Sequence, residues 1–310
     1  MKIENGLEKE YRNGVVCVIA CQLMWGFLPL FWNAINPIES WIIILYRILT
    51  MFIFTIIAAR FKYSWKTIFA PLADRKTRVK YFISGAVLTA NWSLYIWAVT
   101  SGRIVQTSIG YYIEPLVICL FGIVIFREKL TIYNGIAMSL ALVAVIVILM
   151  HFGKLPGVAL GLALTWATYS AIKKSSELPA IIALVYETGV FAIISLFVII
   201  YIEANGMGGL SYHMPGKYAL LFLTGLVTLI PVGLFGAAAP KVSMLLIGLV
   251  QYLSPTISLI CGVMVYGEKV DHVQLIAFII IWIGLAFFTM GEVKTHKQSN
   301  TKIKNKTKGL

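Results

Sequence analysis

Ten long apolar stretches, separated by short polar breaks, constrain this 310-residue chain more than any other feature. Each stretch is close to the roughly 20 residues that an α-helix needs to cross a lipid bilayer. Hydrophobic residues make up 59% of the chain and charged residues only 13%, too few charges to cover a soluble domain of this size. The sequence therefore predicts an all-α polytopic membrane protein whose ten transmembrane helices cover residues 14–35, 41–59, 81–99, 104–126, 131–150, 156–172, 180–202, 218–239, 243–266 and 271–290.

The two ends of the chain are polar. Residues 1–13 are too long and too acidic for the start of a signal peptide, so we expect the first apolar stretch to remain as an uncleaved helix. Residues 291–310 are rich in Lys, Asn and Thr and lack apolar periodicity, which is typical of a disordered basic tail.

The distribution of Lys and Arg predicts the orientation of the helices. With the N-terminus inside, the inner segments carry 21 of the 26 basic residues and the outer loops carry four. Basic residues accumulate on the cytoplasmic side of membrane proteins, so this bias places the protein in the cell membrane with both termini in the cytoplasm. The net charge of +13 is gathered at these membrane borders, which argues against a nucleic-acid partner.

The chain contains an internal repeat at an offset of 140 residues. Tyr112-Ile-Glu-Pro115 aligns with Tyr252-Leu-Ser-Pro255, and the same offset aligns Tyr46-Arg47 with Tyr186-Glu187. Each half holds five predicted helices, and because five is odd the second half enters the membrane from the opposite side. Inverted repeats around a midplane site are typical of secondary transporters. The alternative explanation of the repeat is chance similarity between apolar helices. The two repeats are residues 14–150 and 156–290.

Three ionisable residues lie well within the predicted spans: Arg47, Glu114 and Glu187. A charge at this depth costs a few kcal/mol unless it faces protein or water, so such residues mark functional sites or structural pairs. Either carboxylate is a candidate partner for Arg47, and either is a candidate for exchanging protons during transport. A structural charge network that holds the two halves in register stays open as the alternative.

Further polar and aromatic residues gather on the third, fourth, eighth and ninth predicted spans, which we expect to line a cavity. The fifth and tenth spans are apolar and are expected at the periphery. Aromatic residues in membrane helices also serve plain packing, and that alternative stays open. The candidates for substrate contacts are Asn91, Trp92, Tyr95, Tyr111, Tyr112, Gln251 and Tyr252.

Helix-breaking residues interrupt several of the predicted spans. Each Pro frees a backbone carbonyl that protein or cavity water has to satisfy. Such points also supply bending positions for alternating access. The candidate hinges are Gly26, Pro29, Pro115, Pro231 and Pro255.

Signatures of catalysis and of bound cofactors are missing from the sequence. It contains no H-E-x-x-H, no nucleotide-binding P-loop and no G-x-S-x-G motif. The four Cys residues lie in apolar stretches, and no second Cys or His pair completes a zinc pattern with Cys17 and Cys21. We therefore expect neither an enzyme nor a bound cofactor or metal ion.

Taken together, the motifs resemble those of one family. Asn91-Trp-Ser-Leu-Tyr-Ile-Trp, Ser108-Ile-Gly-Tyr-Tyr-Ile-Glu-Pro-Leu and Phe126-Arg-Glu-Lys-Leu are similar to motifs of the RarD family, within the EamA-type transporters of the drug/metabolite transporter superfamily. The second half agrees through Gly248-Leu-Val-Gln-Tyr-Leu-Ser-Pro and Val265-Tyr-Gly-Glu-Lys. The resemblance covers nearly the whole chain except its tails. One departure is the Glu before the fourth-span Pro, where the family usually has Asn.

The resemblance implies ten helices, two EamA repeats, cytoplasmic termini and an inner-membrane permease. Family members are commonly named as chloramphenicol-sensitivity proteins or permeases. We expect a secondary transporter that moves a small organic metabolite or drug outward by alternating access. Its other expected partners are the lipid bilayer and protons as the coupling ion, and we expect a monomer or homodimer. A passive channel or a membrane receptor with an intramembrane ligand pocket is the alternative.

We expect position 66 to face the cytoplasm and position 210 to face outward, because the bias of basic residues sets this orientation. Lys66→Cys and Leu210→Cys are made in a background without the four native Cys residues. Intact cells are then treated with a membrane-impermeant thiol reagent. Only Leu210→Cys should react, and strong labelling of Lys66→Cys with none of Leu210→Cys would reverse the orientation.

Overall fold

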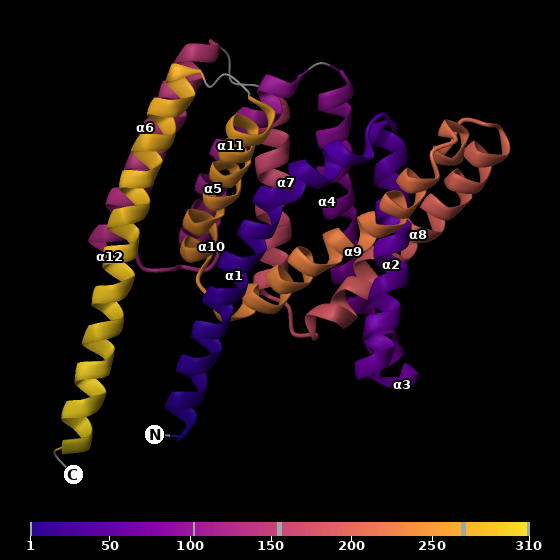
Figure 1. Cartoon of the computed structure of the whole chain (residues 1–310). Helices are drawn as coiled ribbons and strands as arrows, with labels where there is room; N and C mark the ends of the chain where they lie inside the picture. Colours follow the sequence, from indigo (N-terminus) through magenta and orange to yellow (C-terminus); the bar gives the residue numbers. More distant parts are fainter. Residues whose placement is uncertain (1, 102, 154–156, 268–270, 309–310) are drawn as a thin grey trace.

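The helices of the chain form one bundle (Figure 1). A computed structural model describes residues 2–101, 103–153, 157–267 and 271–308. These residues form helices joined by short loops, and no strand occurs among them, so the predicted all-α class is confirmed. The elements are α1 (Lys2–Ile35), α2 (Ser40–Lys62), α3 (Trp65–Phe69), η1 (Ala70–Ala73), α4 (Arg75–Thr100), α5 (Ile104–Val124), α6 (Ile132–Phe152), α7 (Gly157–Lys174), α8 (Ala180–Ala204), η2 (Gly209–Tyr212), α9 (Pro215–Ala238), η3 (Ala239–Lys241), α10 (Met244–Gln251), α11 (Leu253–Tyr266) and α12 (His272–Lys308).

Eight helical segments of the described residues are long and apolar enough to cross a membrane. They are α1, α2, α5, α6, α8, α9, the α10–α11 pair and α12. α4 and α7 pack in the same bundle, against each other and against α8 and α5. α4 begins with a cluster of basic residues, and α7 ends with Lys173 and Lys174. The chain is a multi-pass membrane protein.

Helices that are distant in sequence pack side by side. α1 lies against α9 and α11, whereas α7 lies against α4 and α5. α2 packs on α8 and α9, α4 on α8, α5 on α10, and α6 on α12. In Figure 1, α6 and α12 form one edge of the bundle, and both chain ends lie at the same end of the molecule. The outer surfaces of α6 and α12 expose apolar side chains such as Leu142, Ile146 and Ile279, as lipid contact requires.

Two glycines, 140 residues apart, let two pairs of helices touch at their backbones. A Cβ atom on Gly225 of α9 would lie 2.1 Å from the backbone nitrogen of Met51 in α2. A Cβ atom on Gly85 of α4 would lie 2.1 Å from the carbonyl oxygen of Glu187 in α8. Both distances are far shorter than any real contact, so only glycine fits. Small residues of this kind let membrane helices approach closely.

A carboxylate holds the beginning of α10. Oε1 of Glu128 accepts a hydrogen bond from the backbone N–H of Met244 (2.7 Å), and its Oε2 accepts one from the N–H of Leu245 (3.0 Å). The first N–H groups of a helix have no partner within the helix, and negative charge is favourable there. Glu128, in the connection between α5 and α6, therefore fastens the first half of the chain to the second. Glu268, its counterpart in the repeat, lies outside the described residues.

A hydrogen bond between His151 and Asp271 joins the end of α6 to the start of α12. Nε2 of His151 lies 3.1 Å from Oδ2 of Asp271, and both side chains are partly exposed. The backbone N–H of Val273 donates to the same carboxylate at 2.7 Å. That hydrogen bond and those from Gln274 and His151 hold the pKa of Asp271 below its usual range.

Both terminal helices extend beyond the predicted spans. α1 begins at Lys2, and α12 continues to Lys308, although the sequence analysis expects a disordered tail from residue 291. No Pro or Gly occurs between Glu292 and Lys308. Lys, Gln and Glu are good helix formers, so nothing in this segment ends the helix that the last apolar stretch begins.

We expect Gly225→Ala to destabilise the protein, because the added methyl group has to push α9 away from the backbone of α2. Overpacking of this kind costs about 1–3 kcal/mol. Gly135→Ala in α6 is the matched control, since a Cβ there meets nothing within 4 Å and Ala favours a helix over Gly. Thermal unfolding of both variants in the same detergent checks this, and equal midpoints would contradict the close crossing.

Candidate functional site

Arg47 of α2 lies among aromatic rings. Its guanidinium carbon is 4.1 Å from the centre of the Trp92 ring in α4 and 5.6 Å from that of the Trp32 ring in α1. Its charge also interacts with the phenol groups of Tyr95 and Tyr111. Nε of Arg47 is buried and makes no hydrogen bond within the described part of the chain. The site therefore holds a cation whose neighbours are aromatic.

The two tyrosines beside this cation keep accessible surface. Tyr95 comes from α4 and Tyr111 from α5, and their ring centres lie 6.2 Å apart. The side chains remain 38% and 42% exposed, although both belong to helices that pack within the bundle. Aromatic surface is thus available next to the Arg47 guanidinium.

Glu187 of α8 is paired with a different cation, Lys173 of α7. Nζ of Lys173 lies 3.1 Å from both carboxylate oxygens, and both side chains are fully buried. Oγ of Ser84 and the hydroxyl of Tyr169 donate to the same carboxylate at 2.8 Å and 3.3 Å. Four hydrogen bonds therefore satisfy Glu187 and join α4, α7 and α8. A carboxylate so fully satisfied is suited to a structural role.

The sequence analysis missed Lys173, because it assigned that residue to an inner loop. The signal was available in its spacing, since Lys173 follows Tyr169 by four residues and shares its helix face. Gly236 of α9 leaves room for the lysine: a Cβ atom there would lie 2.9 Å from Cε of Lys173. The flexible four-carbon stem of lysine lets the ammonium group of Lys173 reach Glu187 from near the end of α7.

Glu114 of α5 is hydrogen-bonded across the two halves of the chain. Nε2 of Gln251 in α10 donates to Oε1 of Glu114, and Nε1 of Trp166 in α7 donates to Oε1 of Gln251 at 3.3 Å. All three side chains are buried. No Lys, Arg or His nitrogen lies within 4.0 Å of Glu114 among the residues that the structure describes. The sequence analysis offered two carboxylates as partners of Arg47, and the structure pairs neither with it.

Three other predicted contact residues are directed into the protein core. Nδ2 of Asn91 donates to the carbonyl of Leu162 (3.1 Å) and to Oγ1 of Thr165 (2.9 Å), which ties α4 to α7. Tyr112 and Tyr252 are buried, and the hydroxyl of Tyr252 donates to the carbonyl of Tyr112 at 3.0 Å. These hydrogen bonds hold helices together, and they engage the amide nitrogen of Asn91 and the hydroxyl of Tyr252 within the protein.

The predicted hinge residues do not behave alike. Gly26 of α1 serves a close contact, since a Cβ atom there would lie 2.5 Å from Cβ of Ile257 in α11. α5 runs unbroken through Pro115, whereas the equivalent helix is divided into α10 and α11 at Tyr252, near Pro255. The other two predicted hinges lie inside continuous helices: Pro29 in α1 and Pro231 in α9.

Some buried polar atoms lack a hydrogen-bond partner among the described residues. Both amide atoms of Gln22 in α1 are of this kind, together with the hydroxyls of Thr55 and Ser170. Unsatisfied buried groups are rare and mark places where water or a ligand completes the bonding. The sequence analysis missed Gln22, a single uncharged polar residue within an apolar stretch. Within the described residues, no group of three or more His, Cys, Asp or Glu side chains is placed to hold a metal ion.

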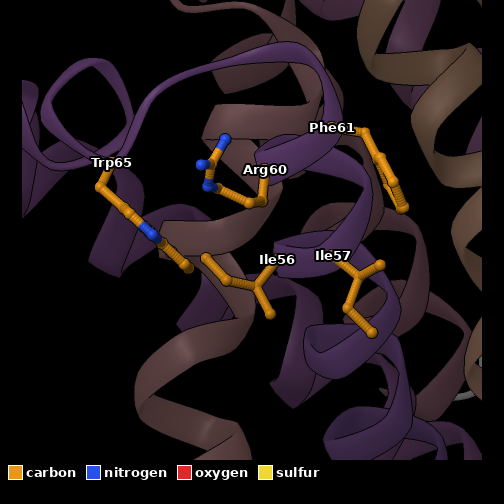
Figure 2. A pocket seen from close by; sticks show the side chains of 5 residues that line it. All are labelled: Ile56, Ile57, Arg60, Phe61 and Trp65. Carbon is orange, nitrogen blue, oxygen red and sulfur yellow. The ribbon is translucent and has the colours of Figure 1, made fainter.

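An apolar hollow of about 210 Å³ lies elsewhere, at the end of α2 next to α3. Ile56, Ile57, Arg60, Phe61 and Trp65 line it (Figure 2). Phe61 is 90% exposed, and the guanidinium carbon of Arg60 lies 5.8 Å from the centre of the Trp65 ring. None of the predicted site residues borders this hollow, and its apolar walls suit lipid better than a polar solute.

Membrane-spanning helices that enclose buried charges and hydrogen-bonded polar groups are typical of membrane transport proteins. The profile of the EamA-like transporter family matches residues 12–150 and 156–290. The chain belongs to this family of membrane transporters.

Individual relatives cover almost the whole chain. The transporter YojE of Bacillus subtilis is 33% identical over 94% of this chain and 98% of its own length. RarD of Streptomyces exfoliatus is 31% identical (98% and 95%), and RarD of Escherichia coli is 28% identical (94% and 99%). The predicted resemblance is therefore confirmed. A solved crystal structure shares the fold with a TM-score of 0.70 at 15% identity, over 89% of this chain and 97% of that one.

We expect Lys173→Met to destabilise the protein strongly, because it leaves Glu187 as a buried charge without a counterion. Breaking a buried pair in this way costs about 3–5 kcal/mol. The double variant Lys173→Met/Glu187→Gln should recover most of that stability, since both charges are then removed. Lys66→Met, at an exposed position of α3, is the control. Thermal unfolding in detergent measures all three, and a double variant no more stable than Lys173→Met would refute the pairing.

Proposed function

We propose that the protein is a secondary transporter that moves a small organic metabolite or drug out of the cell by alternating access. The observation that carries this proposal is the hydrogen-bonded chain of Glu114, Gln251 and Trp166, which brings polar groups of both halves together between the helices. Secondary transporters place their sites at such an interface between repeats. Membership in the EamA-like family and relatives named as transporters support it.

The proposed architecture has ten spans in two inverted repeats, residues 14–150 and 156–290, with α4 and α7 added to the eight apolar segments. The helix contacts support this arrangement. Exchanging the repeats turns the α1–α9 contact into α7–α4, the α1–α11 contact into α7–α5 and the α2–α9 contact into α8–α4. All of these contacts occur. The close crossings at Gly85 and Gly225 are related by the same exchange.

The proposed orientation has both termini in the cytoplasm of a cell-membrane protein. The excess of basic residues on one side supports it. In Figure 1 the two chain ends lie at the same end of the bundle, as this topology requires. The apolar outer surfaces of α6 and α12 meet lipid in a monomer or a second copy of the chain in a homodimer.

Glu114 is the proposed proton-exchanging group. Glu187 is held in an ion pair with Lys173, so its charge is compensated within the protein. Glu114 has only an amide partner, Gln251, and no cation next to it in the described part of the chain. Protonation of such a carboxylate needs no ion pair to be broken. Bending at Pro115 and Pro255, in equivalent helices, is the proposed way in which the two halves change their opening.

Reconstitution into proteoliposomes tests the transport function. A panel of radiolabelled solutes that includes chloramphenicol and aromatic carboxylates is offered, with and without the same solute trapped inside. Saturable uptake that speeds up with trapped solute is expected of a carrier. Uptake without saturation would indicate a channel instead, and binding without any uptake would indicate a receptor.

We expect Glu114→Gln to fold normally but to transport at a rate that depends less on pH, because size and hydrogen bonding are kept while the titrating group is lost. Uptake is measured in proteoliposomes over a series of pH values. Glu177→Gln, in the exposed connection before α8, is the control and should match the parent. A rate and pH profile of Glu114→Gln identical to the parent's would remove Glu114 from proton coupling.

A further inference from the structure

The charge of Arg47 is not neutralised by the described residues. No carboxylate oxygen lies within 4.0 Å of its guanidinium among them. The two mid-membrane carboxylates are committed elsewhere, Glu187 to Lys173 and Glu114 to Gln251. A cation within a membrane span is costly and is normally paired or directed to a water-filled site. Arg47 therefore lacks the counterion that its position calls for.

The aromatic neighbours of Arg47 compensate only part of this deficit. Trp92 at 4.1 Å and Trp32 at 5.6 Å present ring surface to the guanidinium, and a cation is attracted to the face of such a ring. Rings accept no conventional hydrogen bonds along the guanidinium edge. The five N–H groups of an Arg side chain form a planar fork that matches a carboxylate bidentately. The buried Nε has no acceptor within the described residues.

Two other cations of this protein are accommodated differently from Arg47. Lys173, which is also buried, has both oxygens of Glu187 at 3.1 Å. Arg60 also lies over a ring, that of Trp65, but it is placed at the end of α2 and is exposed. Arg47 lies seven residues after Ser40, so it is roughly 10 Å along α2 from the start of the helix.

Resting on the transport function proposed above, we propose that the transported solute is an organic anion: its carboxylate pairs with the Arg47 guanidinium, and its planar apolar part lies against Trp92, Tyr95 and Tyr111. The accessible tyrosine surface beside the cation supplies the second half of this recognition. An aromatic ring stacked between such side chains is held by dispersion and by its preferred edge and offset geometries. The site thus combines the positive charge of Arg47 with the aromatic side chains beside it.

Isothermal titration calorimetry on the purified full-length protein tests this without any transport. The probes are phenylacetate, indole-3-acetate and benzoate, each compared with its neutral amide, and acetate as the anion without a ring. The amides should bind more weakly by on the order of ten- to a hundredfold, the factor expected for one charge-assisted hydrogen-bonded pair. Acetate should also bind more weakly than the aromatic carboxylates.

Variants of Arg47 identify the residue responsible. Arg47→Gln should abolish the preference for the carboxylate over its amide, and Arg47→Lys should keep the preference with weaker binding, because the charge stays and the fork is lost. Arg60→Gln removes the other guanidinium of α2 that lies over a tryptophan ring, that of Trp65 in α3, and should leave binding unchanged. Should Arg47→Gln not fold, as judged by thermal unfolding, the carboxylate–amide comparison on the parent decides.

The possible results separate this inference from the transport function. Equal binding of carboxylates and amides, or no binding of any of the three carboxylates at millimolar concentration, overturns the anion assignment. Equal binding of acetate overturns the role of the rings. If carboxylates bind as expected but no solute is taken up by proteoliposomes, the transport function fails while the anion site stands.

Discussion

The absence of water from the bilayer core decides how the ionisable groups of this protein are arranged. Each of the three ionisable residues within the predicted spans is accommodated differently. Glu187 accepts hydrogen bonds from Lys173, Ser84 and Tyr169. Glu114 accepts one from the side-chain amide of Gln251. Arg47 has aromatic surface and no acceptor among the described residues. The fully paired group binds helices together, and the two groups with incomplete pairing are those that we propose for a solute and a proton.

The same constraint explains why the two halves meet through equivalent residues. Trp25 and Trp166 occupy matching positions of the two halves, and their rings lie 5.2 Å apart in an edge-to-face arrangement. Tyr112 and Tyr252, another matching pair, share a hydrogen bond. Without a hydrophobic driving force between helices in lipid, association depends on close packing and on such hydrogen bonds. The pairs Trp25–Trp166 and Tyr112–Tyr252 each supply one such contact between the two halves.

The sequence predicts properties that depend on neighbouring residues in the chain, and it does not predict those that depend on contacts between distant residues. Apolar length is local, so the helices fell close to their predicted positions, and Arg47, Glu114 and Glu187 stood out as charges in apolar stretches. Partner choice is tertiary. Nothing in the sequence indicates that the amide of Asn91 bonds to the carbonyl of Leu162 rather than facing a cavity. The spacing of Lys173 places it on the helix face of Tyr169 but does not identify Glu187 as its partner. The basic segment after residue 291 was assigned by composition alone, yet it follows a helix that no Pro or Gly stops.

The hydrogen bonds of the Glu128 carboxylate have a consequence for the synthesis of the protein. It caps the backbone of Met244, which is 116 residues further along the chain. At the usual speed of a ribosome, about 5–20 residues per second, the carboxylate waits roughly 6–23 s for its partner to be synthesised. During that interval the first half lies in the membrane while Glu128 lacks its hydrogen-bond partners at the start of α10. The surface of α5 against which α10 packs is uncovered for the same time. The first half thus reaches its final packing only when the second half has been made. Any chaperone that binds membrane proteins during insertion has that interval in which to act.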